Sequence, residues 1–474
     1  MNCYSSVVTL KSFGAKGDGL TDDIISITKA TQILKDGDTL IFDANKNYLV
    51  GGKIVISVSC TILGNYATIT PTDSFMRAGG IFLSVGKGLS NTAVSGLTAV
   101  KGANTITLPS TIKNVKPGDL IQFLSPDLLY SFRADLASFN YSKGQYAIVK
   151  NVAGDNITIS TPFFDSFNVN TVAVFKNCDS TRIYNLTFNL SKQPDTKNPF
   201  IALAIRGTNS TVEKCSFKGN EYAFCAIQVD GENSTIKYCT IKDFFNVQGY
   251  SGGRLGYGIN AACNNITIAK NTISNCKHGF TTAARKFVVS NIKVLQNTFT
   301  EDTLKPIFKF GSVNAQTDYA GTIDIHAGVS DVVLISENII HAQGRAFFVR
   351  NGKAFILSNE IYQHGNPVGL IGVEERPVET LLIQKNNLNL SDSGSYLIGK
   401  YLSLADDALY MKNTIIRQNT CSNGWLFYNS SCKFDIDGLL IEKNIMKNSK
   451  VIYLLKSDSS VIFNNIETQT NTIN

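Results

Sequence analysis

From about Val172 onward, the chain is a succession of short segments in which apolar and polar residues alternate. Two such segments are Tyr257–Ile273, which reads YGINAACNNITIAKNTI, and Arg345–Ile361, which reads RAFFVRNGKAFILSNEI. Each has a short alternating stretch, a polar turn, a second alternating stretch, and then an asparagine followed by an apolar residue. A period of two is typical of β-strands, so the pattern excludes a repeat built from helices.

An asparagine recurs at the same point of these segments. The recurring residues are Asn271, Asn297, Asn338, Asn359, Asn387, Asn419, Asn444 and Asn464. Their spacing fits a unit of roughly 20 residues with insertions, and the leucine framework of leucine-rich repeats is missing. We therefore predict an all-β fold, a right-handed single-stranded parallel β-helix whose coils stack about 4.8 Å apart. The asparagine is expected to fill a turn and to pair along the stack.

The first part of the chain departs from this pattern. Phe13–Asp23 reads FGAKGDGLTDD, and the apolar periodicity of Ile24–Leu34 predicts a short helix capped by Asp22 or Asp23. A helix at the open end of a β-helix protects an exposed sheet edge. Residues 80 to 165 interrupt the coil pattern and are interpreted as an inserted β-subdomain. The predicted organisation is 1–79 for the capping helix and first coils, 80–170 for the inserted subdomain and 171–474 for the main β-helix with a groove.

Composition narrows the class of protein. Of the 474 residues, 43% are hydrophobic and 17% are charged, which excludes a disordered chain. The net charge of +7 is small for this length and no basic run is dense, so no nucleic-acid partner is expected. Residues 1–13 lack the pattern of a signal peptide, and no apolar run is long enough for membrane insertion. The ten cysteines are interpreted as buried reduced thiols.

Stacking the segments also predicts a site. Suppose that one inward-facing ladder consists of Ile227, Ile259, Phe280, Ile323 and Phe347. Residues one and three positions later then face outward. One outward row is Gln228, Asn260, Thr281, Asp324 and Phe348, and the next is Asp230, Ala262, Ala283, His326 and Arg350. Asp324 and His326 therefore share an outward face, one coil from Arg350, with His278 at the corner of the neighbouring coil.

This set of residues suits the cleavage of an acidic glycopolymer. An imidazole acts as acid or base near neutral pH. Asp324 can orient it, act as a partner acid or help to hold a divalent cation; no cofactor is otherwise implied. Two insertions, 243–256 and 300–320, leave the coil beside this strand and are expected to wall the groove. The predicted catalytic residues are His278, Asp324 and His326.

Several further residues are predicted to bind the polymer. Arginine can bind phosphate or carboxylate through two parallel hydrogen bonds, and an aromatic ring can stack on a sugar. The predicted binding residues are Gln228, Asp230, Arg254, Tyr257, Asn260, Thr281, Arg345 and Arg350. A simpler interpretation stays open for most of the predicted catalytic and binding residues. They could form an ordinary polar strand face, with His278 as a structural corner residue and Asp230 as a surface charge.

Three motifs carry a resemblance to a known family. FGAKGDGLTDD resembles the opening segment of pectate-lyase-like β-helix proteins, which include bacteriophage tailspikes and pectin- or alginate-acting enzymes. GDLIQF and KGQYAIVKNV are similar to the inserted subdomain of tailspikes and of the pre-neck appendage proteins of small phages that infect Gram-positive hosts. GRLGYGI, NCKHGFTT and TIDIH are similar to the Tyr-Gly-Ile, Arg-His and Asp-x-His pattern of that group, although Lys277 replaces its arginine.

This resemblance implies a function and a setting. It implies a tailspike-like protein that binds and cleaves an anionic glycopolymer of the host surface, teichoic acid or capsular polysaccharide, as a hydrolase. It also implies a homotrimer in the virion tail, made in the host cytoplasm and attached to other phage tail proteins. The hydrolase would be a glycosidase or, on teichoic acid, a phosphodiesterase, and β-elimination in a uronate polymer remains a further alternative. A receptor-binding tail protein that does not cleave, and a bacterial polysaccharide lyase, remain as alternatives.

Overall fold

The computed structural model describes most of the chain. The described residues are 5–130, 141–192, 198–220, 223–244, 256–282, 288–301, 322–326, 328–329, 332–350, 352–364, 369–373, 378–391, 395–400, 409–429, 434–454, 462–469 and 472–473. Arg254, which is expected to bind the polymer, lies outside these residues, as do Ala283 and most of the two insertions expected to wall the groove, 243–256 and 300–320.

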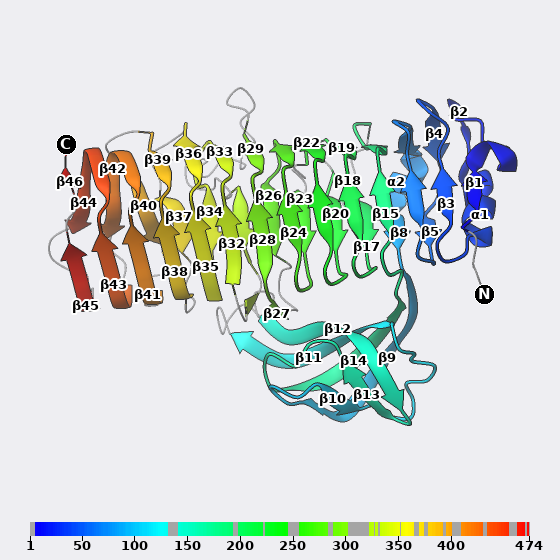
Figure 1. The fold of residues 1–474 in the computed structure, drawn as a ribbon, viewed down its shortest axis with the longest axis horizontal. Coiled ribbons are helices and arrows are strands. Elements are labelled where there is room, and N and C mark those ends of the chain that lie inside the picture. Colours follow the sequence, from blue (N-terminus) through cyan, green and yellow to red (C-terminus); the bar gives the residue numbers. More distant parts are fainter. Residues whose placement is uncertain are drawn as a thin grey trace.

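The strands form an elongated stack of coils (Figure 1). A representative coil has three strands, β24 (Thr267–Ala269), β25 (Thr272–Ser274) and β26 (His278–Thr282). Each strand pairs in parallel with its counterparts in the coils before and after it. One row of such strands runs from β1 (Val7–Thr9) to β45 (Ile462–Gln469) as a sheet of 14 strands. The predicted parallel β-helix is therefore confirmed.

Buried asparagines link the coils at one turn. They are Asn271, Asn297, Asn338, Asn359, Asn386, Asn419 and Asn444. Each of the first six donates its backbone N–H and its side-chain Nδ2 to Oδ1 of the next asparagine, at 2.8 to 3.0 Å. Nδ2 of each also donates to a strand carbonyl in the preceding coil, such as Ile335 O for Asn359. This asparagine ladder satisfies the backbone where the chain turns.

Two of the asparagines predicted to form the ladder, Asn387 and Asn464, do not belong to it. Asn386 occupies the ladder position, whereas Asn387 is exposed and begins β39 (Asn387–Asn389). Asn464 lies within β45, opposite Asp437, rather than in a turn. The reason is the turn geometry: the residue before each ladder asparagine has a left-handed backbone, as Lys385 does with φ 57°. That bend directs the following side chain, at 386, into the stack.

The N-terminal end is closed by a helix, as predicted. Helix α1 (Ile24–Ile33) covers the first coils (Figure 1), and its residues Ile27 and Ala30 are fully buried. Asp23 is at the N-cap position, but its carboxylate accepts the N–H groups of Lys16 and Gly17 instead of capping the helix. Asp22 Oδ1 accepts the N–H of Ile24 at 3.0 Å, so Asp22 is the residue that contacts the first turn.

The inserted segment forms a separate antiparallel sheet. Its six strands run from β9 (Lys87–Ala99) to β14 (Phe167–Lys176) and lie beside the stack of coils (Figure 1). They enclose their own apolar core. The preceding strand β8 (Gly80–Val85) still pairs within the β-helix, so the sheet begins and ends a few residues after the predicted limits of 80 and 170. The subdomain docks on the coils through Leu120, Tyr146 and Ile148, which belong to the main core.

Candidate active site on the outer face of the coils

One row of strands has the predicted alignment of inward-facing and outward-facing residues. The row contains β20 (Cys225–Val229), β23 (Tyr257–Ala261), β26, β30 (Ile323–Ile325) and β34 (Phe347–Val349). Ile227, Ile259, Phe280, Ile323 and Phe347 pair in succession and are fully buried. The outward row of Gln228, Asn260, Thr281, Asp324 and Phe348 also pairs in succession, which confirms the predicted register.

Asp324 is the centre of a cluster of charged and aromatic side chains. Its carboxylate has no exposed surface and receives the Arg350 guanidinium in a fork, with Nε 2.8 Å from Oδ1 and Nη2 2.9 Å from Oδ2. His278 Nε2 lies 3.3 Å from Oδ2, and His326 Nδ1 lies 3.7 Å from the same oxygen. The structure thus brings three of the predicted site residues, Arg350, His278 and His326, together around the carboxylate of a fourth, Asp324.

Aromatic packing supports this cluster. The His278 ring stacks on Tyr257, with centroids 5.7 Å apart and planes at 12°, and it meets the edge of Phe348 at 6.3 Å. The guanidinium groups of Arg350 and Arg345 lie 5.0 and 5.6 Å from the centre of the Phe348 ring. Cation–π contacts of this kind hold a guanidinium in a defined position. Tyr257 and Arg345 are themselves buried, so in this conformation both support the cluster from within.

Only part of the cluster reaches the surface. The side chains of His326 and Arg350 are 13% and 14% exposed, against 3% for His278 and none for Asp324. The backbone N–H of His326 donates to Thr282 Oγ1 at 2.8 Å, which fixes the end of the strand. His326 is therefore the more exposed of the two imidazoles of the cluster, and the carboxylate of Asp324 lies behind it.

The upstream predicted residues form a different network. Asn260 Nδ2 donates to Gln228 Oε1, and Gln228 Nε2 donates to Asp230 Oδ1, both at 2.7 Å. Arg206 Nε lies 3.3 Å from Asp230 Oδ2, and its guanidinium covers Phe175 of the subdomain at 5.1 Å. Burial raises the pKa of Asp230, while Arg206 and Gln228 oppose that shift. These residues join the subdomain to the coils and are not gathered around Asp324.

The remaining predicted features are placed as follows. Thr281 is buried, and its hydroxyl donates to the carbonyl of Thr282 at 3.0 Å. Among the described side chains, no group of three or more His, Cys, Asp or Glu is arranged to hold a metal ion. Neither described α-helix is long and apolar enough to cross a membrane.

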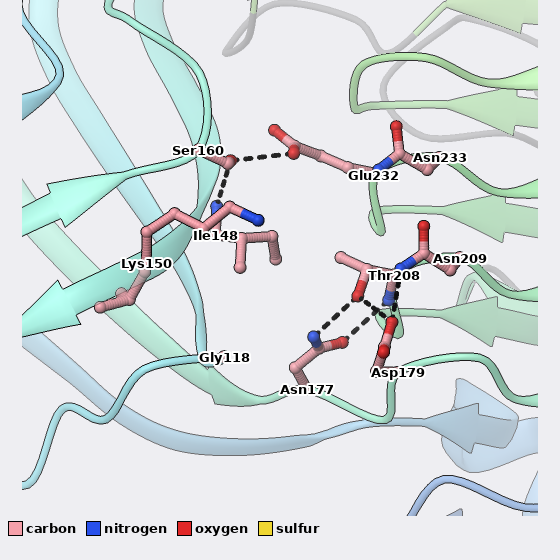
Figure 2. A pocket seen from close by; sticks show the side chains of 11 residues that line it. Gly118, Ile148, Lys150, Ser160, Asn177, Asp179, Thr208, Asn209, Glu232 and Asn233 are labelled. Atoms are coloured by element: carbon pink, nitrogen blue, oxygen red, sulfur yellow. Dashed lines mark hydrogen bonds between the residues drawn. The ribbon is translucent and has the colours of Figure 1, made fainter.

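A polar cavity of about 270 Å³ lies at the junction with the subdomain, away from Asp324. Figure 2 shows Ser160 of the subdomain pointing toward Glu232, to which its hydroxyl donates at 3.0 Å. On the other wall, Thr208 bonds both Asn177 and Asp179 (Figure 2). Because these polar groups satisfy one another, we interpret the cavity as part of the joint between the subdomain and the coils.

The fork between Arg350 and Asp324 leads to a first prediction. Arg350→Lys is expected to lower the free energy of unfolding by about 1–2 kcal/mol, because an ammonium group replaces two parallel contacts by one. Denaturant unfolding followed by circular dichroism measures the change. Arg417→Lys is the control: Arg417 is 37% exposed and 3.9 Å from Glu442, so a change within about 0.5 kcal/mol is expected. Equal losses in the two variants would contradict the special position of Arg350.

The comparisons with known proteins define the class. A family model described as "Right handed beta helix region" matches residues 148–316, which agrees with the predicted right-handed parallel β-helix fold that the strands of this structure form. No curated protein sequence matches the chain.

Solved structures of phage tailspikes share this fold. Tailspike gp61 of Pseudomonas phage phi297 has a TM-score of 0.58 at 12% identity, over 93% of this chain and 75% of its own. Tailspike gp49 of Pseudomonas phage LKA1 gives 0.54 at 14% identity, over 98% and 81%. The Gp54 tailspike of Acinetobacter baumannii phage AP22, in complex with A. baumannii capsular saccharide, gives 0.51 at 12% identity, over 98% and 75%. The predicted resemblance to tailspikes is thus confirmed at the level of the fold.

Proposed function

We propose that the protein is a phage tailspike-like depolymerase, which binds and cleaves an anionic glycopolymer of the host surface. The observation that carries this proposal is the outward-facing cluster in which Arg350 and two imidazoles surround the buried Asp324. The fold likeness to tailspikes supports it, and one of those proteins was solved with a capsular saccharide. Teichoic acid and capsular polysaccharide are the two polymer classes proposed as substrate.

The geometry favours a mechanism driven by an imidazole. His326 would accept a proton from the attacking water in hydrolysis, or from the carbon beside the carboxylate in β-elimination, and the imidazolium so formed would return a proton to the leaving oxygen. Asp324 would orient the cluster, and Arg350 would face the anionic substrate. A two-carboxylate glycosidase needs its acids about 5 to 9.5 Å apart. Asp230 lies three coils before Asp324 along the stack, so the two carboxylates are separated by about 14 Å at about 4.8 Å per coil. We therefore favour phosphodiester hydrolysis or β-elimination over glycoside hydrolysis by this pair.

A receptor-binding protein that does not cleave is the second candidate. The low exposure of His326 and Arg350 favours it, because a catalytic imidazole must contact the reacting atoms directly and only a small part of His326 is open to a polymer. A bacterial polysaccharide lyase, the third candidate, would use the same imidazole for β-elimination. The inserted subdomain, which is similar to that of tailspikes, argues against it.

The decisive experiment is product analysis with the purified protein. It is incubated with teichoic acids, capsular polysaccharides and uronate polymers, and phosphomonoester, reducing ends and the absorbance of unsaturated products are read in parallel. Phosphomonoester release supports hydrolysis of a phosphodiester, and absorbance of an unsaturated product supports elimination. Absence of product in every channel from a polymer that the protein demonstrably binds would refute the enzyme and leave the receptor-binding protein.

We also propose a homotrimer in the phage tail, attached to other tail proteins. The proposal comes from the resemblance to tailspikes, because the long coil faces of a β-helix can pack around a threefold axis. Size-exclusion chromatography with light scattering is expected to give three times the chain mass of 51.6 kDa. A monomer at micromolar concentration would contradict this prediction.

A further inference from the structure

A buried glutamate outside the cluster connects three coil segments. Glu301 follows β29 (Thr298–Thr300) and is 6% exposed. Its Oε1 accepts the hydroxyl of Thr322 at 2.8 Å, and its Oε2 accepts the backbone N–H of Gln343 at 2.7 Å. Its own N–H donates to the carbonyl of His341 at 3.0 Å, and its carbonyl accepts Gln343 Nε2 at 3.3 Å. Both carboxylate oxygens are therefore used to hold neighbouring segments.

Thr322 transmits this contact to the candidate active site. It directly precedes strand β30, which carries Asp324, and its carbonyl accepts the N–H of Gly279, the residue after His278, at 2.7 Å. Its N–H donates to the carbonyl of Arg345 at 3.3 Å. A displacement of Thr322 would thus shift the backbone at His278, Asp324 and Arg345.

We propose that Glu301 is a positioning residue, which holds strand β30 through Thr322 and thereby fixes Asp324 and His326. Glu301 does not belong to the exposed face of the cluster, so it acts through Thr322 and not on a substrate. Its effect on cleavage rests on the proposed function, whereas its effect on the geometry of the cluster does not. A mispositioning of about 1 Å in a catalytic group is enough to slow a reaction about 100-fold.

The chemistry of the carboxyl group makes this contact sensitive to pH. Burial raises the pKa of Glu301 to about 7, against the opposing effects of the hydrogen bonds from Gln343 and Thr322. The groups that face it are Thr322 before β30, Gln343 and the His341 backbone at β33 (Ile339–Ala342), and the thiol of Cys276 before β26. Burial chiefly raises the pKa of Cys276, and the charges of Asp243 and Glu301 add to it.

The sign of the pH effect follows from the raised pKa. The folded protein favours the neutral carboxyl, so its stabilising contribution is complete below the unfolded-state pKa of 4.5. That contribution is lost as the pH rises from 4.5 through about 7, because a buried negative charge then forms. Glu301→Gln cannot ionise, and its amide can donate to the Thr322 hydroxyl while its oxygen accepts from Gln343.

The first measurement needs no turnover. With only four histidines in the chain, histidine-labelled protein gives few imidazole NMR signals. At pH 6, Thr322→Val and Glu301→Ala are expected to shift the signals of His278 and His326. Glu337→Gln, an exposed glutamate beside the same stack, is expected to shift neither. Unchanged His278 and His326 signals in Thr322→Val would overturn the proposal, even if Glu301→Ala does not fold.

The second measurement tests the carboxyl group itself. Glu301→Gln is expected to melt within about 1 °C of the wild type at pH 5 and roughly 2–5 °C above it at pH 8. The same difference at both pH values would contradict the role of ionisation.

Cleavage is the third measurement. If the wild type cleaves a polymer, Thr322→Val is expected to lower kcat about 10-fold with KM within about 3-fold. Glu301→Gln should extend the activity toward higher pH. If the wild type cleaves nothing while the imidazole signals respond as expected, the proposed function fails and the positioning role stands. Normal kcat in both Glu301→Gln and Thr322→Val, without a change in the pH profile, would overturn the role in cleavage.

Discussion

Replacement of His326 by alanine is expected to lower the rate of polymer cleavage about 10²- to 10⁴-fold, with binding of the polymer changed by less than about 3-fold. The reason is that His326 is the more exposed of the two imidazoles of the cluster, with Nδ1 3.7 Å from the buried Asp324. Removal of the ring takes away the proton acceptor but leaves Arg350 in place to contact an anion. Turnover under saturating polymer and binding by surface plasmon resonance measure the two quantities separately.

A matched control separates chemistry from a general loss of imidazole. His364→Ala is expected to keep the wild-type rate, because His364 contacts His341, with Nε2 and Nδ1 3.0 Å apart, outside the cluster. Asp324→Asn should keep a side chain of the same size while it weakens the orientation of His326, and is expected to fall between the two. Full turnover in His326→Ala and Asp324→Asn would place the reaction elsewhere on the molecule.

The register of strands β23, β26 and β30 could be predicted because it depends on one rule. Coils of a parallel β-helix stack in register, and side chains alternate in and out along each strand. Aligning Ile259, Phe280 and Ile323 therefore placed Asp324 and His326 on one face, and the structure has the same pairing. Their neighbour Arg350 followed from the same alignment. The rule needs only local alternation, which the sequence displays directly.

Exposure could not be predicted by this rule. An outward side chain is still buried when a long side chain from the next coil or an inserted domain covers it. Arg350 and Phe348 cover Asp324 in this way, and the subdomain covers the Arg206–Asp230 pair through Phe175. Such contacts depend on where the inserted sheet docks and on which long side chains lie in the next coil. The alternation of apolar and polar residues contains no information on either.

Glu301 was missed for a related reason. In the sequence it is one acid at the start of the predicted 300–320 insertion, and it resembles a solvated turn residue. Its burial arises because Thr322 and Gln343, 21 and 42 positions later, close over it. The choice between Asn386 and Asn387 was also out of reach, because two adjacent asparagines give the same pattern. The left-handed backbone of Lys385 decides between them.

That adjacent pair provides the largest expected effect on stability. Asn386→Ala is expected to lower the free energy of unfolding by about 4–6 kcal/mol, whereas Asn387→Ala should change it by less than about 0.5 kcal/mol. Asn386 Oδ1 accepts two hydrogen bonds from Asn359, and its Nδ2 donates to Asn419 Oδ1 and to Ile356 O. Alanine leaves these four partners without this side chain in a buried turn, each at a cost of about 1–3 kcal/mol.

The comparison is measured as rates of unfolding in guanidinium chloride, because a stack of coils need not unfold in one reversible step. Asn386→Ala is expected to unfold much faster than the wild type, and Asn387→Ala at nearly the wild-type rate. Because the two changes delete the same atoms one residue apart, composition and chain entropy are matched. A similar acceleration in both variants would mean that the asparagine ladder fills space without holding the coils together. Retention of the wild-type rate by Asn386→Ala would mean that water satisfies the turn once the ladder is broken.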